Sequence, residues 1–405
     1  MKDDTIWNKN FICVMLGNFM MSMAFGSTNP LVVTYTEHIG AGIQMAGLLT
    51  GMFFGVSFVF RPFVGPAMTK LDKRKLLVIV FIIGAAANVG YALFQSISAF
   101  VAFRFLNGVQ FSFIGTLLMA MAGDHLPKAK LTSGMGMYGV GAAAGSAIAP
   151  SIGEALLRFG TNLRDESFGF SVMFMFGAFI FAMAIIPTLL IDSDKKSAED
   201  LISTGAWHKN IYTRHAIPVT ILMFFTMLPH AMIHVYMVEF GWELGIASVG
   251  AFYVVLAVTL TVTRPIGGYL IDRFGIAPIM FPALALFALA LFVIGSSSTL
   301  NTMILGAVLA AIGLGASQPT LQAMCMQIET PLRRSVATNT LFVAIDLGMF
   351  LGPVFGGFVR VRADFATMYR LSAILPILAL ITFAIILPIH KRRVAELEKR
   401  QEHGV

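Results

Sequence analysis

The sequence predicts an all-α polytopic membrane protein in which twelve transmembrane helices form two six-helix bundles, related by a pseudo-two-fold axis along the membrane normal. Three observations lead to this fold class. The mean hydropathy is +0.81. A composition of 57% apolar and only 12% charged residues is untypical of a water-soluble chain of 405 residues. Twelve apolar stretches are long enough to cross a bilayer. The second half of the chain also repeats the first.

Each apolar stretch supplies the roughly 20 residues that a helix needs to cross a hydrocarbon core of about 30 Å. Lipid offers the backbone no hydrogen-bond partner, so each span must be helical. In the first half we expect spans at residues 11–35, 45–68, 76–96, 99–122, 132–157 and 169–191. In the second half we expect them at residues 215–238, 247–271, 279–298, 302–326, 335–359 and 367–388.

The repeat has a constant offset of 203 residues. Arg61–Gly65 returns as Arg264–Gly268, and a short charged loop follows both copies. Without a gap, the same offset also pairs Gly145 with Gly348, Pro150 with Pro353 and Gly153 with Gly356. Agreement of rare residues at one spacing indicates two copies of one unit. An even number of spans per copy makes them parallel repeats, an arrangement known from transporters.

The repeat and the charge distribution predict the domains and their orientation. Residues 1–191 form an N-terminal bundle, 192–214 a cytoplasmic linker, and 215–405 a C-terminal bundle with a basic cytoplasmic tail. With the N-terminus in the cytoplasm, 20 of the 28 Lys and Arg residues lie on the cytoplasmic side, five on the other side and three within spans. This asymmetry predicts an integral protein of the plasma (inner) membrane with both termini cytoplasmic. The basic loops are expected to face anionic lipid, not nucleic acid.

Here the residues resemble a known family. The repeated motif is similar to the signature between helices 2 and 3 of the major facilitator superfamily, Gly-x-x-x-Asp-Arg/Lys-x-Gly-Arg/Lys-Arg/Lys. The second copy supplies Gly268, Asp272, Arg273 and Gly275. The first copy has Thr69 and Asp72 where the family has Asp and Gly, and keeps Gly65, Lys70, Lys73 and Arg74. The resemblance implies that these loops act as conformational latches, with the acid of the first latch missing.

Two further motifs strengthen this resemblance, and the second of them points to the exporter branch of the family. Arg104-Phe-Leu-Asn-Gly108 is similar to the family's Arg-x-x-Gln-Gly. Gly352-Pro-Val-Phe-Gly-Gly357 matches the Gly-Pro-x-x-Gly-Gly pattern of antiporters, which normally lies in helix 5 and here lies in helix 11. Pro150 and Pro353 are expected to kink symmetric, glycine-rich helices.

Charged residues inside a bilayer are costly and therefore suggest function. In the family's arrangement helix 2 packs on helix 11, so Arg61 is expected to pair with Asp346 and to close the cytoplasmic side; alternatively, Arg61 extends to the interface and Asp346 bonds locally. Arg264 has no acid at the symmetric position. Its expected partners are carbonyls of the fifth span.

Arg104 has two candidate acidic partners at similar depth, Glu37 and Glu154. A carboxylate that competes with substrate for a cation is a workable proton carrier. Alternatively, both acids are solvated at helix ends. Asp346 and His230 are the other proton-coupling candidates.

The expected pocket is polar. His230 and His234 share one helix face, because they are four residues apart; they either line the cavity or bond to neighbouring helices. The other candidate lining residues are Asn18, Arg104, Asn107, Gln110, Gln318 and Gln322. Cys13 and Cys325 fall in different copies and show no metal-ligand spacing, so neither a disulfide nor a metal is expected.

The resemblance implies a secondary transporter that needs no cofactor and is driven by the proton gradient. We expect a monomer that exports a small organic molecule. The alternatives are a proton- or sodium-coupled importer, a polytopic membrane enzyme that uses the histidines, or a substrate sensor that has lost transport.

Overall fold

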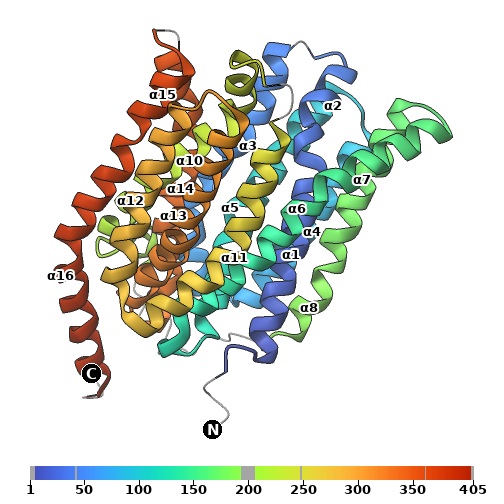
Figure 1. Ribbon diagram of the computed structural model, residues 1–405. Coiled ribbons are helices and arrows are strands. Elements are labelled where there is room, and N and C mark those ends of the chain that lie inside the picture. The colour runs from blue at the N-terminus through green and yellow to red at the C-terminus, as the bar shows by residue number, and fades with distance from the viewer. Residues whose placement is uncertain (1–4, 42, 193–205, 247–248, 361, 403–405) are drawn as a thin grey trace. The chain divides into compact units, whose positions relative to one another are not determined.

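The computed structural model describes residues 5–41, 43–192, 206–246, 249–360 and 362–402 (Figure 1). Within these ranges, every regular element is a helix, and twelve helices are long and apolar enough to cross a membrane. The expected all-α, twelve-span fold class is confirmed. Most of the expected linker, residues 193–205, lies outside the described ranges.

Contacts divide the chain into two compact units. Unit 1 comprises Met1–His125 and Gly141–Ile211, and unit 2 comprises Leu126–Val140 and Tyr212–Val405. The division differs from the expected domains at residues 126–140, which group with the second half of the chain. Helix α6 (Leu131–Leu163) is therefore shared between the units.

Unit 1 holds the remaining spans of the first half. Several start at a polar residue whose side chain accepts a backbone N–H of the first turn, as Asn8, Asp72, Ser96 and Asp165 do. The helices are α1 (Lys9–Thr28), α2 (Val32–His38), α3 (Ile43–Lys70), α4 (Lys73–Leu93), α5 (Ile97–Asp124), α7 (Glu166–Met183) and α8 (Ile185–Leu190). Short 3₁₀ helices are η1 (Asn29–Leu31) and η3 (Trp207–Asn210), and unit 2 contains η2 (Lys128–Lys130) and η4 (Pro331–Arg333).

Three expected spans are interrupted, each near a proline. The first span breaks at Asn29 and Pro30, where η1 separates α1 from α2. The sixth breaks at Ala184 and the twelfth at Ala373, three residues before Pro187 and Pro376. Proline has no N–H, so the carbonyl four residues earlier loses its helical partner.

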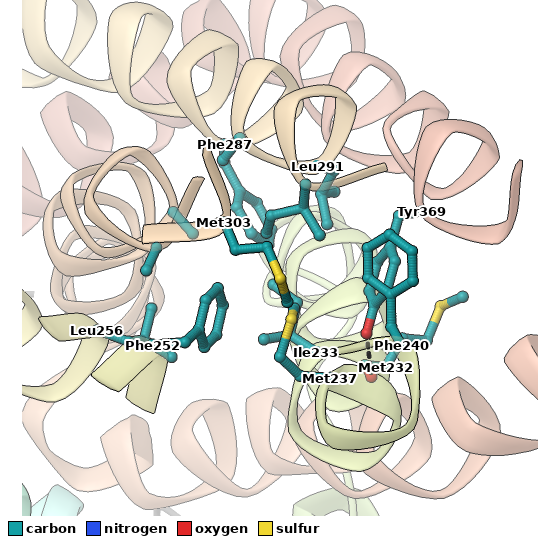
Figure 2. Close-up of a cluster of buried hydrophobic side chains, with 14 of the residues drawn as sticks. Met232, Ile233, Met237, Phe240, Phe252, Leu256, Phe287, Leu291, Met303 and Tyr369 are labelled. Carbon is teal, nitrogen blue, oxygen red and sulfur yellow. Dashed lines mark hydrogen bonds between the residues drawn. The ribbon is translucent and has the colours of Figure 1, made fainter. Parts of the chain in front are cut away.

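Unit 2 holds α10 (Ile217–Glu243), α11 (Gly250–Phe274), α12 (Ile276–Gly295), α13 (Leu300–Gln327), α14 (Arg334–Arg360), α15 (Phe365–Ser372) and α16 (Ile374–Glu402). Its core is apolar and close-packed. Figure 2 shows Met232, Phe240, Phe287 and Met303 meeting from three helices, and all are at most 1% exposed. The hydroxyl of Tyr369 donates to the carbonyl of Met232 at 3.3 Å.

Helix α16 runs to Glu402, although the twelfth span was expected to end at residue 388 (Figure 1). The extra turns are rich in Lys, Arg, Glu and Ala, which are good helix formers. Arg393 and Glu396 pair at 3.7 Å, and Leu397 is buried. Charge alternation thus continues the helix past the apolar stretch.

The repeated glycines have matching roles in the two units. A Cβ at Gly145 would lie 2.6 Å from the Phe19 carbonyl oxygen on α1, and one at its repeat partner Gly348 would lie 2.6 Å from Met227 Cβ on α10. Both distances are too short for a side chain. Glycine therefore allows α6 to pack against α1 in unit 1, and α14 to pack against α10 in unit 2.

Candidate functional site

Arg104 is the central charged residue of unit 1. It lies on α5 and is 2% exposed. Its Nη2 donates to Asn29 Oδ1 at 2.9 Å, its Nε donates to the Leu49 carbonyl at 3.3 Å, and its guanidinium lies 4.8 Å from the ring centre of Phe53. Asn29 reaches it because the first span breaks at this residue. These two hydrogen bonds go to neutral oxygens, which hold the guanidinium without cancelling its charge.

Neutral polar side chains of the expected pocket lie buried on neighbouring turns. Asn107 donates through Nδ2 to Gln110 Oε1 at 3.4 Å, and both side chains are at most 4% exposed. The buried Nε2 of Gln110 has no hydrogen-bond partner among the described residues. Asn18 on α1 is 2% exposed. Unit 1 therefore keeps unsatisfied hydrogen-bonding capacity within its helices, which suits a ligand of mixed polarity.

The two acids expected near Arg104 differ in their surroundings. Glu154 forms an ion pair with Arg158 at 2.5 Å, and both side chains are more than half exposed. Glu37 is exposed at the end of α2. These surroundings favour the alternative that both acids are solvated at helix ends over the one in which either acid neutralises Arg104.

Arg264 on α11 has the kind of partner that the sequence predicted. Its Nη1 donates to the carbonyl of Gly139, on the part of α6 that belongs to unit 2, at 2.8 Å. Its Nη2 donates to Oε1 of Gln318 on α13 at 3.1 Å. The prediction of a carbonyl of the fifth span is confirmed, and Gln318 is now assigned a direct partner.

The second latch motif lies against the beginning of α6. Asp272 Oδ2 accepts the backbone N–H of Ser133 at 2.9 Å. A carboxylate at the first turn of a helix satisfies a free N–H and interacts favourably with the helix dipole. A Cβ at Gly268 would lie 2.7 Å from the Thr132 oxygen, so glycine permits this approach. Arg273 donates to the Tyr269 hydroxyl at 3.3 Å.

His230 and His234 form an edge-to-face ring pair on α10, with centroids 4.6 Å apart. Tyr253 of α11 donates to the His234 carbonyl at 3.3 Å. His230 Nδ1 is buried and has no hydrogen-bond partner in the described part of unit 2. Among the described residues, no group of three or more His, Cys, Asp or Glu side chains could hold a metal.

Arg61 and Asp346 lie in different units, so their pairing stays a prediction. Arg61 is 1% exposed and donates from Nη1 to the Ser112 carbonyl and to Thr116 Oγ1, both at 2.6 Å. Asp346 is 2% exposed on α14. Both are buried charges within spans, which marks them as functional candidates.

The remaining candidates lie on α3, α6, α13 and α14. Gly65 is buried in α3, Lys70 is the partly buried last residue of α3, and Gln322 is partly buried within α13. Pro150 and Pro353 lie inside α6 and α14, and the Pro353 carbonyl accepts from Tyr236 at 2.6 Å. Cys13 and Cys325 are buried free thiols.

Sequence reasoning missed the ion pair of the first latch loop. Lys73 Nζ lies 2.5 Å from Asp124 Oδ2 at the end of α5, and the side chains are 4% and 23% exposed. Asp72 caps α4 by accepting from Arg74 N at 2.9 Å. The acid that the loop lacks is thus supplied by another helix. The available signal was a Lys at the start of α4 and an Asp at the end of α5. It was not recognised because the two residues are far apart in the sequence.

We expect Lys73→Met to lower the unfolding free energy by about 2 kcal/mol, because the partly buried Asp124 loses its cation. Thermal unfolding in detergent measures this. Lys73→Met/Asp124→Leu should recover at least half of the loss, and the exposed Lys75→Met should change little. If Lys73→Met were as stable as the parent, the ion pair between Lys73 and Asp124 would not stabilise the fold, and the assignment would be wrong.

The chain is similar to known proteins in both sequence and fold. A model of the Major Facilitator Superfamily matches residues 14–276 and 219–404. The multidrug resistance protein MdtG of Proteus mirabilis is 24% identical over 388 residues, covering 91% of this chain and 93% of that protein. The staphylopine export protein of Staphylococcus aureus is 21% identical over 381 residues, covering 90% and 93%. The crystal structure of the human organic anion transporter MFSD10 superimposes with a TM-score of 0.74 at 16% identity, covering 92% of this chain and 98% of that one.

Proposed function

Because the chain belongs to the Major Facilitator Superfamily, a family of transporters and not of enzymes, we propose that it exports a small organic molecule in exchange for protons. Two relatives that align over about nine-tenths of the chain are named a multidrug resistance protein and an export protein. The Gly-Pro-x-x-Gly-Gly pattern at residues 352–357 supports the same direction. The protein would work as a monomer in the plasma membrane, with both termini in the cytoplasm, by alternating access.

The observation that carries the substrate proposal is the environment of Arg104. A cation within a span that is held by the neutral oxygens of Asn29 and Leu49 attracts an anionic or zwitterionic group. Asn107 and Gln110 supply donors and acceptors for the remaining polar atoms of the substrate. We therefore expect a substrate that carries a carboxylate or a similar acidic group.

The proton carrier that we propose is Asp346. It is the candidate acid that is buried within a span, whereas Glu37 and Glu154 are exposed. A carboxyl enclosed within a span can couple its proton to a neighbouring cation and to substrate. The buried, unpartnered Nδ1 of His230 makes this histidine the second candidate.

Transport by the purified protein in liposomes tests the function. A panel of organic anions, zwitterions and hydrophobic cations is offered to vesicles whose lumen is acidic and whose protein exposes its cytoplasmic side. An antiporter accumulates its substrate in the lumen, and a protonophore abolishes the accumulation. Arg104→Ala should weaken the apparent affinity about tenfold or more for an acidic substrate, because a buried charge-assisted contact is lost.

The importer alternative gives the opposite result in the same vesicles. A proton symporter accumulates substrate only when the lumen is alkaline, because substrate and proton move together. A sodium symporter responds to a sodium gradient and ignores the pH gradient. Accumulation in either of these conditions, and none with an acidic lumen, would reject the antiport proposal while leaving family membership intact.

A further inference from the structure

A groove at one end of unit 2 carries two arginines that have no partner among the described residues. The groove lies between the start of α10 and the last turns of α16, with a volume of about 470 Å³. Arg214 lines it just before α10, and Arg392 lines it from α16. Neither guanidinium forms an ion pair or a hydrogen bond with a described residue. Two such cations create a strongly positive groove.

The other charged groups that line the groove do not cancel this charge. Glu396 is the only acid among the described lining residues, and it is paired with Arg393 at 3.7 Å. Arg393 Nη2 also lies 3.5 Å from Nδ1 of His215, and His215 is paired with the buried Glu329 at 3.1 Å. The acids near the groove thus have their own partners.

The groove also has apolar lining residues next to the arginines. Pro218 lines it from α10, and Ile386 and Ile389 line it from α16; Ile389 is 58% exposed. His390 of α16 also lines the groove. It is 4% exposed, its Nε2 contacts Gln327 at 3.3 Å, and its buried Nδ1 has no partner in the described part of the chain.

We propose that this groove binds one anionic phospholipid from the leaflet that faces the basic loops. The lipid phosphate would lie between Arg214 and Arg392, where guanidinium groups can form bidentate hydrogen bonds to its oxygens. An acyl chain would lie along the apolar side chains of Ile386 and Ile389. Basic pockets beside membrane helices at this depth suit lipid headgroups.

The amphipathic lining distinguishes a lipid from free phosphate. Inorganic phosphate would use the arginines but would leave the apolar lining at Ile386 and Ile389 without a function. A lipid uses both the arginines and the isoleucines, and the bilayer presents it at high local concentration. This inference is independent of the transported substrate, because it depends only on contacts within unit 2 and on the chain being in a membrane.

Native mass spectrometry of the full-length protein, released from detergent with phosphatidylglycerol, tests the proposal. We expect one retained lipid per protein, and at least about tenfold weaker retention in Arg214→Gln/Arg392→Gln, because two charge-assisted contacts are lost. Arg214→Lys/Arg392→Lys should keep most of the retention. Arg362→Gln/Arg370→Gln removes the same charge near α15, at the other end of α16, and should leave retention unchanged.

The outcomes separate the possible ligands. The proposal is supported if phosphatidylglycerol is retained in preference to phosphatidylcholine, and if this preference is lost only in Arg214→Gln/Arg392→Gln. Equal retention of both lipids, or equal loss in the Arg362/Arg370 control, overturns it. Displacement of the lipid by millimolar inorganic phosphate would assign the groove to a small anion instead, and would also overturn it. A melting temperature of each variant confirms that the protein is folded before lipid is added.

Discussion

Asp346→Asn should abolish export driven by a pH gradient while leaving substrate exchange intact. An amide cannot gain or lose a charge, so the energy of the proton gradient no longer reaches the substrate. We expect gradient-driven accumulation to fall by about 100-fold or more, and counterflow between equal pH values to change by less than about threefold. Both rates are measured in the same liposome preparation, once a substrate is known.

Glu154→Gln is the matched control for this prediction, since it makes the same chemical change at an acid that is exposed and paired with Arg158. It should transport like the parent protein. If Asp346→Asn still accumulates substrate against its gradient, the carrier is another group, and His230→Gln becomes the next variant to test. Loss of counterflow together with accumulation would instead assign Asp346 a structural role.

Gly153→Ala should produce the largest loss of stability. A Cβ at Gly153 would clash with the Ser27 carbonyl oxygen and would lie 2.8 Å from its carbonyl carbon. Both are backbone atoms of α1, so relief requires one helix to move away from the other. We expect a loss of about 3 kcal/mol or more, at the upper end of overpacking effects. Fluorescence-detected size exclusion after heating measures it.

Gly55→Ala provides a control of opposite sign. Among the described residues, no atom outside the local backbone of α3 lies within 4 Å of a Cβ at Gly55, and alanine is favoured over glycine within a helix by about 1 kcal/mol. This variant should therefore melt at or above the parent temperature. Equal melting temperatures for Gly153→Ala and the parent would show that α1 and α6 are not in the contact described here.

The fold was predictable from sequence because it depends on hydropathy, which each segment carries by itself. The duplication was equally accessible, since Gly145 and Gly348 keep their spacing and both meet a neighbouring helix closely. The carbonyl partner of Arg264 followed from the absence of an acid at the symmetric position. The end of α16 was missed because a hydropathy pattern does not register a helix held by alternating charges.

The candidate site was less predictable because its contacts join residues that are far apart in the chain. Arg104 was identified as an isolated charge, but its partner Asn29 is 75 residues away. The Lys73 and Asp124 pair is separated by 51 residues. One local signal was present and was not used: Asn29 precedes a proline in the middle of an apolar span, where a helix tends to break.

The break at Asn29 has a mechanical consequence. Asn29 accepts a hydrogen bond from the Arg104 guanidinium and also lies at the break between α1 and α2. The same hydrogen bond therefore restrains both the cation and the chain at this break. Any solute that draws the guanidinium away from Asn29 also loosens the chain at that break. The hydrogen bond from Arg104 to Asn29 Oδ1 thereby couples recognition of charge to the freedom of α2.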